Sequence, residues 1–146
     1  MATLFSKNFS YEEMIASSTA KAKKIDNSAP PEAKKKLEKL CKEVLQPIRD
    51  KYGHAITVTS GYRCPKLNAA VGGVKNSQHV FGEAADIKCT ATSKAKLFKL
   101  IKEMIQNGEI KVGQLIWEYG TKTEPNWIHV SLPYKKTNQI LYLYSK

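Results

Sequence analysis

The spacing of apolar residues along the chain predicts helices. Over residues 32–52 apolar side chains recur every three or four positions, and lysines occupy the opposite face. Pro47 should kink this helix or end its regular hydrogen bonding near the last turn. A second amphipathic helix is predicted from about residue 93 to 107. Ser10 followed by Glu13 has the spacing of a capping box, which indicates a short helix that begins near residue 11.

Alternating and β-branched stretches predict strands between these helices. Residues 55–59 form one such stretch and lead into a loop at 60–65, which we expect at one end of a sheet. Residues 114–119 and 127–132 are typical of two strands of a hairpin, closed by the polar residues between them. A last strand is predicted over residues 140–144. The mixture of helices and strands over 146 residues predicts a single domain spanning residues 1–146.

Composition excludes two classes of protein. Hydrophobic residues make up 42% of the chain, and no segment approaches the roughly 20 consecutive apolar residues of a membrane-spanning helix. We therefore expect neither membrane insertion nor a disordered chain. The amino-terminal residues show no secretory signal pattern, so the expected place of synthesis and first residence is the cytoplasm.

The charge balance predicts a polyanionic partner. There are 24 basic and 13 acidic residues, which gives a formal net charge of +11. Only Arg49 and Arg63 are arginines, and lysine lacks the planar donor fork that specific phosphate and base recognition favours. Specific nucleic-acid binding is therefore not expected.

The cysteines do not indicate a disulfide framework or a thiolate zinc site. Cys41, Cys64 and Cys89 are widely spaced and odd in number. We expect free, buried thiols. Cys64 and Cys89 lie on either side of the segment that contains His79 and Asp86. Whether they form a disulfide stays open, because disulfide geometry does not follow from sequence.

Two histidines and an aspartate form the strongest candidate for chemistry. His79 and Asp86 lie seven residues apart around a loop of small residues, and His129 lies in the apolar strand 127–132. Two imidazoles and one carboxylate suit a zinc site that keeps a fourth position for water or substrate. Spacing alone also permits a simpler interpretation, in which His129 is a core histidine and Asp86 hydrogen-bonds to backbone.

The surroundings of these residues make the pattern more specific. Ser-x-His-x-x-Gly-x-Ala-x-Asp at residues 77–86, Trp-Ile-His-Val-Ser at 127–131 and Ser-Gly-Tyr-Arg at 60–63 together resemble the zinc D-Ala-D-Ala carboxypeptidase superfamily. The resemblance runs from residues 9–13 to Ser131 and is greatest to small single-domain members from bacteria and phages. It implies an α+β fold with a small antiparallel sheet and flanking helices, shared with the Hedgehog signalling domain.

The resemblance also implies roles for single residues. His79, Asp86 and His129 match the zinc ligands, so Zn²⁺ is the expected cofactor. Arg63 matches an arginine that is expected to hold a substrate carboxylate or stabilise the developing oxyanion, although a structural ion pair would also explain it. Ser77 matches the motif serine, which contacts substrate or a ligand or, more simply, caps a turn.

The general base is not given by the motif. Several branches of the superfamily have a carboxylate three residues before the last histidine, where this chain has Asn126. Glu118 is our first choice, because a hairpin places it beside or diagonal to His129 if the register is right. Glu124 in the connecting loop is the alternative, and Glu83 is expected to be exposed.

These inferences combine into a functional hypothesis. The chain is expected to be a monomeric zinc metallopeptidase that hydrolyses an amide bond in the peptide stem of peptidoglycan. It would act as a D-Ala-D-Ala carboxypeptidase or as an endopeptidase of the endolysin type, and would reach the cell wall after lysis or export. The alternative is a catalytically inactive, zinc-stabilised module that binds the cell wall or another protein.

Overall fold

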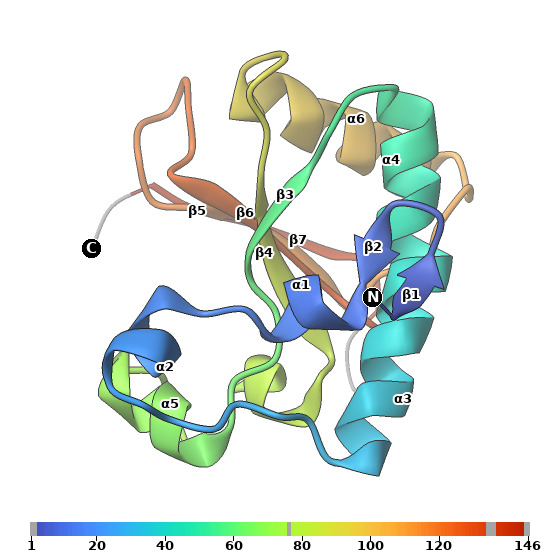
Figure 1. Cartoon of the computed structure of the whole chain (residues 1–146). Helices are drawn as coiled ribbons and strands as arrows, with labels where there is room; N and C mark the ends of the chain where they lie inside the picture. The colour runs from blue at the N-terminus through green and yellow to red at the C-terminus, as the bar shows by residue number, and fades with distance from the viewer. Residues whose placement is uncertain (1–2, 76, 134–136, 145–146) are drawn as a thin grey trace.

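A mixed five-stranded sheet forms the centre of the structure (Figure 1). The computed structural model describes residues 3–75, 77–133 and 137–144. The strand order is β3-β4-β6-β5-β7. Its strands are β3 (Thr57–Ser60), β4 (Ala84–Lys88), β5 (Gln114–Glu118), β6 (Trp127–Ser131) and β7 (Gln139–Leu143). The predicted hairpin is confirmed as β5 and β6, and the predicted last strand as β7.

The pairing directions refine the predicted fold class. The pairs β3–β4, β4–β6 and β5–β6 are antiparallel, as expected, whereas β7 lies parallel to β5. A separate two-stranded ribbon joins β1 (Leu4–Ser6) and β2 (Phe9–Ser10). The α+β class is therefore confirmed, with one parallel pair at an edge of the sheet that the sequence did not predict.

The helices surround this sheet. They are α1 (Tyr11–Ile15), α2 (Ser18–Ala22), α3 (Pro31–Leu40), α4 (Gln46–Tyr52), α5 (Pro65–Ala70) and α6 (Lys94–Gln106), with the 3₁₀ turn η2 (Gln78–Phe81). Figure 1 shows α3 and α4 stacked along one side of the molecule, α2 and α5 together at one end, and α6 toward the other end. None of the helices in the described ranges is long and apolar enough to cross a membrane.

The predicted helix at residues 32–52 contains a wider turn just before its proline. Between α3 and α4 lies the π-helical segment η1 (Cys41–Leu45), and the Gln46 N–H donates to the carbonyl of Cys41, five residues earlier. Pro47 has no N–H to give, and its ring would crowd a regular turn. The expected disturbance is thus confirmed, but the helix continues to Tyr52 before Gly53, with φ of 77°, ends it.

Alternation along the strands separates the core from the site. α6 packs on one face of the sheet, where the rings of Phe98 and Trp117 meet edge to face at 5.3 Å between centroids. Successive strand residues point to opposite faces. Four residues of the two central strands are buried in the core on the α6 side: Ala85, Ile87, Ile128 and Val130. Asp86 and His129 therefore point to the opposite face.

The cysteines agree with the expectation of free thiols. All three are free, with Cys41 and Cys89 buried and Cys64 half-buried. No disulfide joins Cys64 to Cys89. The Cys64 sulfur instead accepts a hydrogen bond from the Leu67 N–H and caps α5.

Candidate metal centre

The fold brings His79, Asp86 and His129 together. Asp86 on β4 and His129 on β6 lie directly opposite each other in the antiparallel pair, and His79 reaches them from η2. One possible ligand atom from each residue lies within 4.8 Å of those of the other two. Both histidines are buried, at 3% and 7% exposure. Residues 43 positions apart in sequence thus share one site because two strands pair in this register.

The turn that carries His79 depends on the residues at its two ends. The Ser77 hydroxyl accepts the His79 N–H at 3.2 Å and starts η2. Gly82 ends it with φ of 74°, and a Cβ there would lie 2.5 Å from the Ala33 carbonyl oxygen. Both the backbone angle and the close approach to α3 require glycine at this position.

The ring of His79 is oriented by backbone. Its Nδ1 lies 2.7 Å from the carbonyl oxygen of Gly61. A carbonyl only accepts, so Nδ1 carries the hydrogen and Nε2 has the lone pair in the neutral ring. That Nε2 lies 3.4 Å from Oδ2 of Asp86.

The ring of His129 is held in a similar way by a side chain. Its Nε2 lies 2.7 Å from Oε1 of Gln78, and its Nδ1 lies 3.1 Å from Oδ1 of Asp86. Each histidine therefore bonds an oxygen acceptor with its outer nitrogen and turns its inner nitrogen toward the Asp86 carboxylate. Outer acceptors of this kind typically orient metal-ligating histidines.

The charge of Asp86 completes this donor set. Burial would raise the pKa of Asp86, but the imidazoles of His129 and His79 that face it outweigh burial and hold the pKa well below its usual value when a proton lies on a facing nitrogen. Asp86 is therefore a carboxylate at neutral pH. Lone pairs on two imidazoles facing a carboxylate repel one another unless a proton or metal cation is shared among them. Two nitrogens and one oxygen at these distances fit the ligand chemistry of zinc.

Arg63 and Ser77 lie beside this cluster. Nη2 of Arg63 donates to Oγ of Ser77 at 3.3 Å, and the Arg63 backbone N–H donates to the carbonyl of His79. Among the described residues, Nε of Arg63 is buried without a hydrogen-bond partner. Burial lowers the pKa of Arg63 and the nearby Asp86 charge opposes that change. An arginine pKa is high enough for the guanidinium to stay charged, so the site contains a cation with donors to spare.

Glu118 lies on the same sheet face as His129. In the β5–β6 pair Ile116 is opposite His129 and Glu118 is opposite Trp127. Glu118 is therefore one pair further along the face, diagonal to His129, and half-exposed. Diagonal neighbours are within reach of long side chains.

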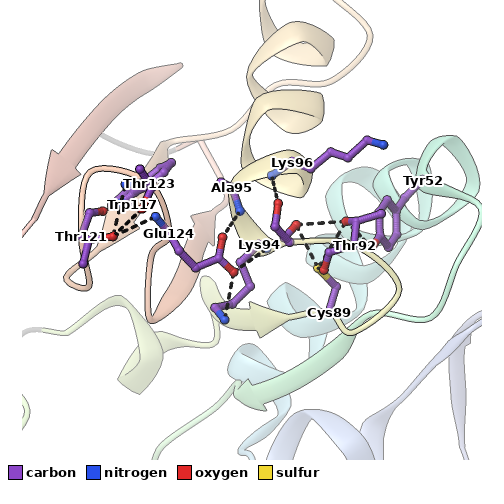
Figure 2. Close-up of polar contacts among 11 residues, drawn as sticks. Tyr52, Cys89, Thr92, Lys94, Ala95, Lys96, Trp117, Thr121, Thr123 and Glu124 are labelled. Atoms are coloured by element: carbon purple, nitrogen blue, oxygen red, sulfur yellow. Dashed lines mark hydrogen bonds and ion pairs between the residues drawn. The ribbon is translucent and has the colours of Figure 1, made fainter.

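Glu124 has a different place. Its two carboxylate oxygens accept the backbone N–H groups of Lys94 and Ala95 at 2.9 and 3.0 Å, and it pairs with the Lys94 ammonium (Figure 2). Burial would raise its pKa, but these bonds outweigh it and lower the pKa of Glu124. The alternative base is thus committed to the amino terminus of α6, where a carboxylate is favourable.

Glu83 differs from its expected exposure. It is buried and pairs with Lys36 of α3 at 3.0 Å. Its backbone carbonyl also accepts the Leu132 N–H. Glu83 therefore ties the motif segment to α3, and the prediction of a solvent-exposed side chain was wrong because α3 covers this segment.

Sequence reasoning missed Asn27 and Gln78. The Asn27 amide donates to the carbonyls of Ile15 and Tyr62 at 2.8 and 3.0 Å and accepts the Cys64 N–H at 2.7 Å. It holds the loop that carries Arg63. Nothing in the lysine-rich and proline-rich stretch around Asn27 indicates that its side chain is buried and holds a loop distant in sequence. Gln78 was adjacent to the motif histidine, but only the 3₁₀ turn shows that its side chain reaches the other histidine.

Comparison with known families agrees with this geometry. The family model for peptidase M15 matches residues 7–131, which is most of the chain and includes every residue of the cluster. A search of curated proteins found no match. The chain therefore belongs to the peptidase M15 family, the family of the zinc D-Ala-D-Ala carboxypeptidases.

Proposed function

We propose that this protein is a zinc-dependent peptidase that hydrolyses an amide bond in the peptide stem of bacterial peptidoglycan. The observation that supports this most is the arrangement of His79, Asp86 and His129, whose inner nitrogens and carboxylate face one another within 4.8 Å. Membership of the M15 family makes a peptide the expected substrate. The stem peptide contains D-amino acids, which fits the D-Ala-D-Ala carboxypeptidases of that family.

Three side chains would hold the metal. They are His79 through Nε2, His129 through Nδ1, and the Asp86 carboxylate, because these atoms face one another. When bound in such a site, zinc lowers the pKa of a water molecule toward neutrality and polarises a carbonyl. The ionised Asp86 reduces the net charge of the site by one.

Glu118 is the proposed general base. It lies on the same sheet face as His129 and is half-exposed, so a substrate bound on that face could reach it. A carboxylate there takes a proton from the attacking water and gives it to the leaving amine. Glu124 is not proposed, because its oxygens are bonded to the amino terminus of α6.

Arg63 is proposed to bind substrate. Its guanidinium is oriented by Ser77 and has donors beyond that one hydrogen bond. It would hold the terminal carboxylate of a stem peptide or the negative charge that develops on the carbonyl oxygen. Ser77 is proposed to contact the substrate from the same side.

The rest of the molecule fits a cell-wall substrate. A net charge of +11 attracts anionic wall polymers and raises their local concentration. We propose that the enzyme reaches the wall after lysis or export, as a phage endolysin does, and acts as a monomer.

The first test is mass spectrometry of purified peptidoglycan fragments. They are incubated with the zinc-loaded protein and, in parallel, with protein stripped by a chelator. Loss of one terminal alanine only in the loaded sample would establish a carboxypeptidase, and larger stem fragments would establish an endopeptidase. No cleavage across several wall types by protein that holds stoichiometric zinc would contradict the proposal.

The alternative is a non-catalytic zinc module that binds the wall or a protein. Asn126 favours it, because an exposed amide stands where several branches of the superfamily have a carboxylate. The two functions differ in what Glu118→Gln does. If Glu118 is the base, this variant keeps zinc but loses about 10²–10⁴-fold in cleavage rate.

The matched control for that variant is Glu43→Gln, at an exposed position of η1. It should keep both zinc and the cleavage rate. Unchanged cleavage by Glu118→Gln would remove Glu118 from the mechanism, and zinc binding without cleavage in the wild-type protein would favour the alternative.

A further inference from the structure

The sheet face that carries Asp86 and His129, here called the metal face, continues across two more strands. Ile116 on β5 lies opposite His129, and Leu141 on β7 lies opposite Ile116. Residues that pair across neighbouring strands point to the same face. Buried Ile116 and half-buried Leu141 therefore form an apolar row that begins at His129. Alternate residues of the same two strands pack in or against the core on the α6 side instead: Leu115, Trp117 and Ile140.

Leu143 extends this row and is open to solvent. It lies opposite Glu118, which also points to the metal face, and 41% of it is exposed. A single exposed leucine is ordinary on a protein surface, but this one adjoins an apolar row that leads to the candidate metal centre. Residues 7–131 match the M15 family model, so β7 and its leucines lie outside that match.

Arg63 lies on the other side of the metal centre. It follows β3, which is the first strand in the order β3-β4-β6-β5-β7, and it bonds to Ser77 and to the backbone of His79. β7 is the last strand in that order. A peptide that is held at its terminal carboxylate by Arg63 and crosses the metal centre in extended form then runs toward β5 and β7 with its amino-terminal part.

The strand spacing sets how far along such a peptide the leucines lie. Neighbouring strands are about 4.8 Å apart, so β7 is about 10 Å from β6. An extended peptide advances about 3.3 Å per residue, so about three residues span this distance. The side chain that reaches Leu141 and Leu143 is accordingly that of the third residue on the amino side of the cleaved bond.

We propose that Leu141 and Leu143 form a specificity subsite that binds an aliphatic side chain of the substrate, at the third residue on the amino side of the cleaved bond. The surface that they offer with Ile116 is apolar, and covering apolar surface with an aliphatic group is favourable. This inference rests on the proposed peptidase function and deepens it, because a terminal dipeptide is too short to fill the subsite.

Cleavage of two acetylated tetrapeptides tests the length and the chemistry together. Both end in D-Ala-D-Ala, and their first residue is leucine in one and asparagine, of similar size, in the other. Where wall fragments identify another cleaved bond, the pair is built on that bond with the same third residue. The leucine peptide should have a KM about 10-fold lower at similar kcat, because the contact is made in the ground state and the transition state alike. Equal KM values would overturn the proposal.

Variants on β7 test the residues. Leu143→Gln should raise the KM of the leucine peptide about 10-fold and leave its kcat unchanged, whereas Leu143→Met should behave as the wild type. Tyr142→Gln is the matched control, since Tyr142 is 39% exposed but points to the other face, where its ring meets Phe98. An equal rise in KM for Leu143→Gln and Tyr142→Gln would show that β7 acts only by completing the sheet, and would overturn the subsite.

A binding experiment separates this inference from the proposed function. Methyl spectra of zinc-loaded protein with ¹³C-labelled leucine are recorded during titration with the product peptide acetyl-Leu-Ala-D-Ala. The signals of Leu141 and Leu143 should shift, and the corresponding peptide with asparagine should shift them less. If nothing is cleaved but these signals shift, the peptidase function fails and the subsite stands. If peptides are cleaved while the signals stay in place, the subsite fails and the function stands.

A second copy of the chain is the competing occupant of this surface. Size-exclusion chromatography with light scattering measures the mass of the wild type and of Leu143→Gln over a series of concentrations. Both should be monomeric throughout. A wild-type dimer that Leu143→Gln converts to a monomer would assign these leucines to a contact between copies and would overturn the proposal.

Discussion

At the scale of single residues, burial alters the chemistry of Cys41 strongly. Its side chain is fully buried, and this burial, with the charges of Glu13 and Glu38, raises the pKa of the thiol to about 12. The thiolate is the reactive form of cysteine, so Cys41 should be inert in the folded protein.

Alkylation of the native protein in mildly alkaline buffer tests this expectation. Peptide mass mapping should find Cys41 unmodified by iodoacetamide, while the half-buried Cys64 reacts. In denaturant both should react at similar rates. Modification of Cys41 at the rate of Cys64 without denaturant would show that the core around η1 opens readily.

The residues of the site differ in how far sequence could predict them. His79, Asp86, His129, Arg63 and Ser77 were all identified through motifs, and the structure brings them together. Their catalytic and ligand roles stay predictions. Gln78 and Asn27 were missed because their partners are distant in sequence, and a side-chain amide has no spacing rule that shows what it will bond.

At the scale of elements, the junction between η2 and α3 depends on Gly82. This glycine has φ of 74°, and an added Cβ would lie 2.5 Å from the Ala33 carbonyl oxygen. Gly82→Ala should lower the free energy of unfolding by about 1–3 kcal/mol through strain and displacement of η2, and zinc affinity should fall because His79 moves.

Gly53→Ala is the control for that variant. Gly53 has a similar φ of 77°, but nothing lies within 4 Å of its added Cβ. It should lose only the backbone term, about 1 kcal/mol, and keep its zinc affinity. Denaturant unfolding and zinc titration of both variants provide the measurement, and equal losses of stability would contradict the steric argument.

The long helices followed from their periodicity and the short helix α1 from its capping box, whereas the short helices α2 and α5 were not predicted. Periodicity predicted α6 and the helix at residues 32–52, because an amphipathic face repeats over several turns. The helix α5 is too short for such a pattern and was missed. The parallel direction of β7 was also missed, because the residues of a strand do not show which strand it pairs with or in which direction.

At the scale of the whole molecule, the net charge of +11 should act on large anionic substrates but not on small ones. Attraction to a wall polymer is screened by salt, since the Debye length falls from about 30 Å at 0.01 M to about 3 Å at 1 M. A short stem peptide gains little from the distant lysines.

We therefore expect salt to slow the cleavage of intact cell walls much more than that of a soluble stem peptide. Release of fragments from walls and hydrolysis of the peptide are followed over the same series of sodium chloride concentrations. A parallel decline of both rates would place the salt effect in the site itself rather than in the molecule's surface charge.

The bonds of Asn27 have a practical consequence for shortening this protein. The Asn27 side chain, in the segment before α3, holds the loop that contains Arg63. The carbonyl of Met14 accepts the Tyr62 N–H from the same loop. Deleting residues 1–27 would spare every proposed ligand yet remove the braces of the Arg63 loop. The amino-terminal segment therefore supports the candidate site from outside it, and fusion partners are better attached ahead of this segment than substituted for it.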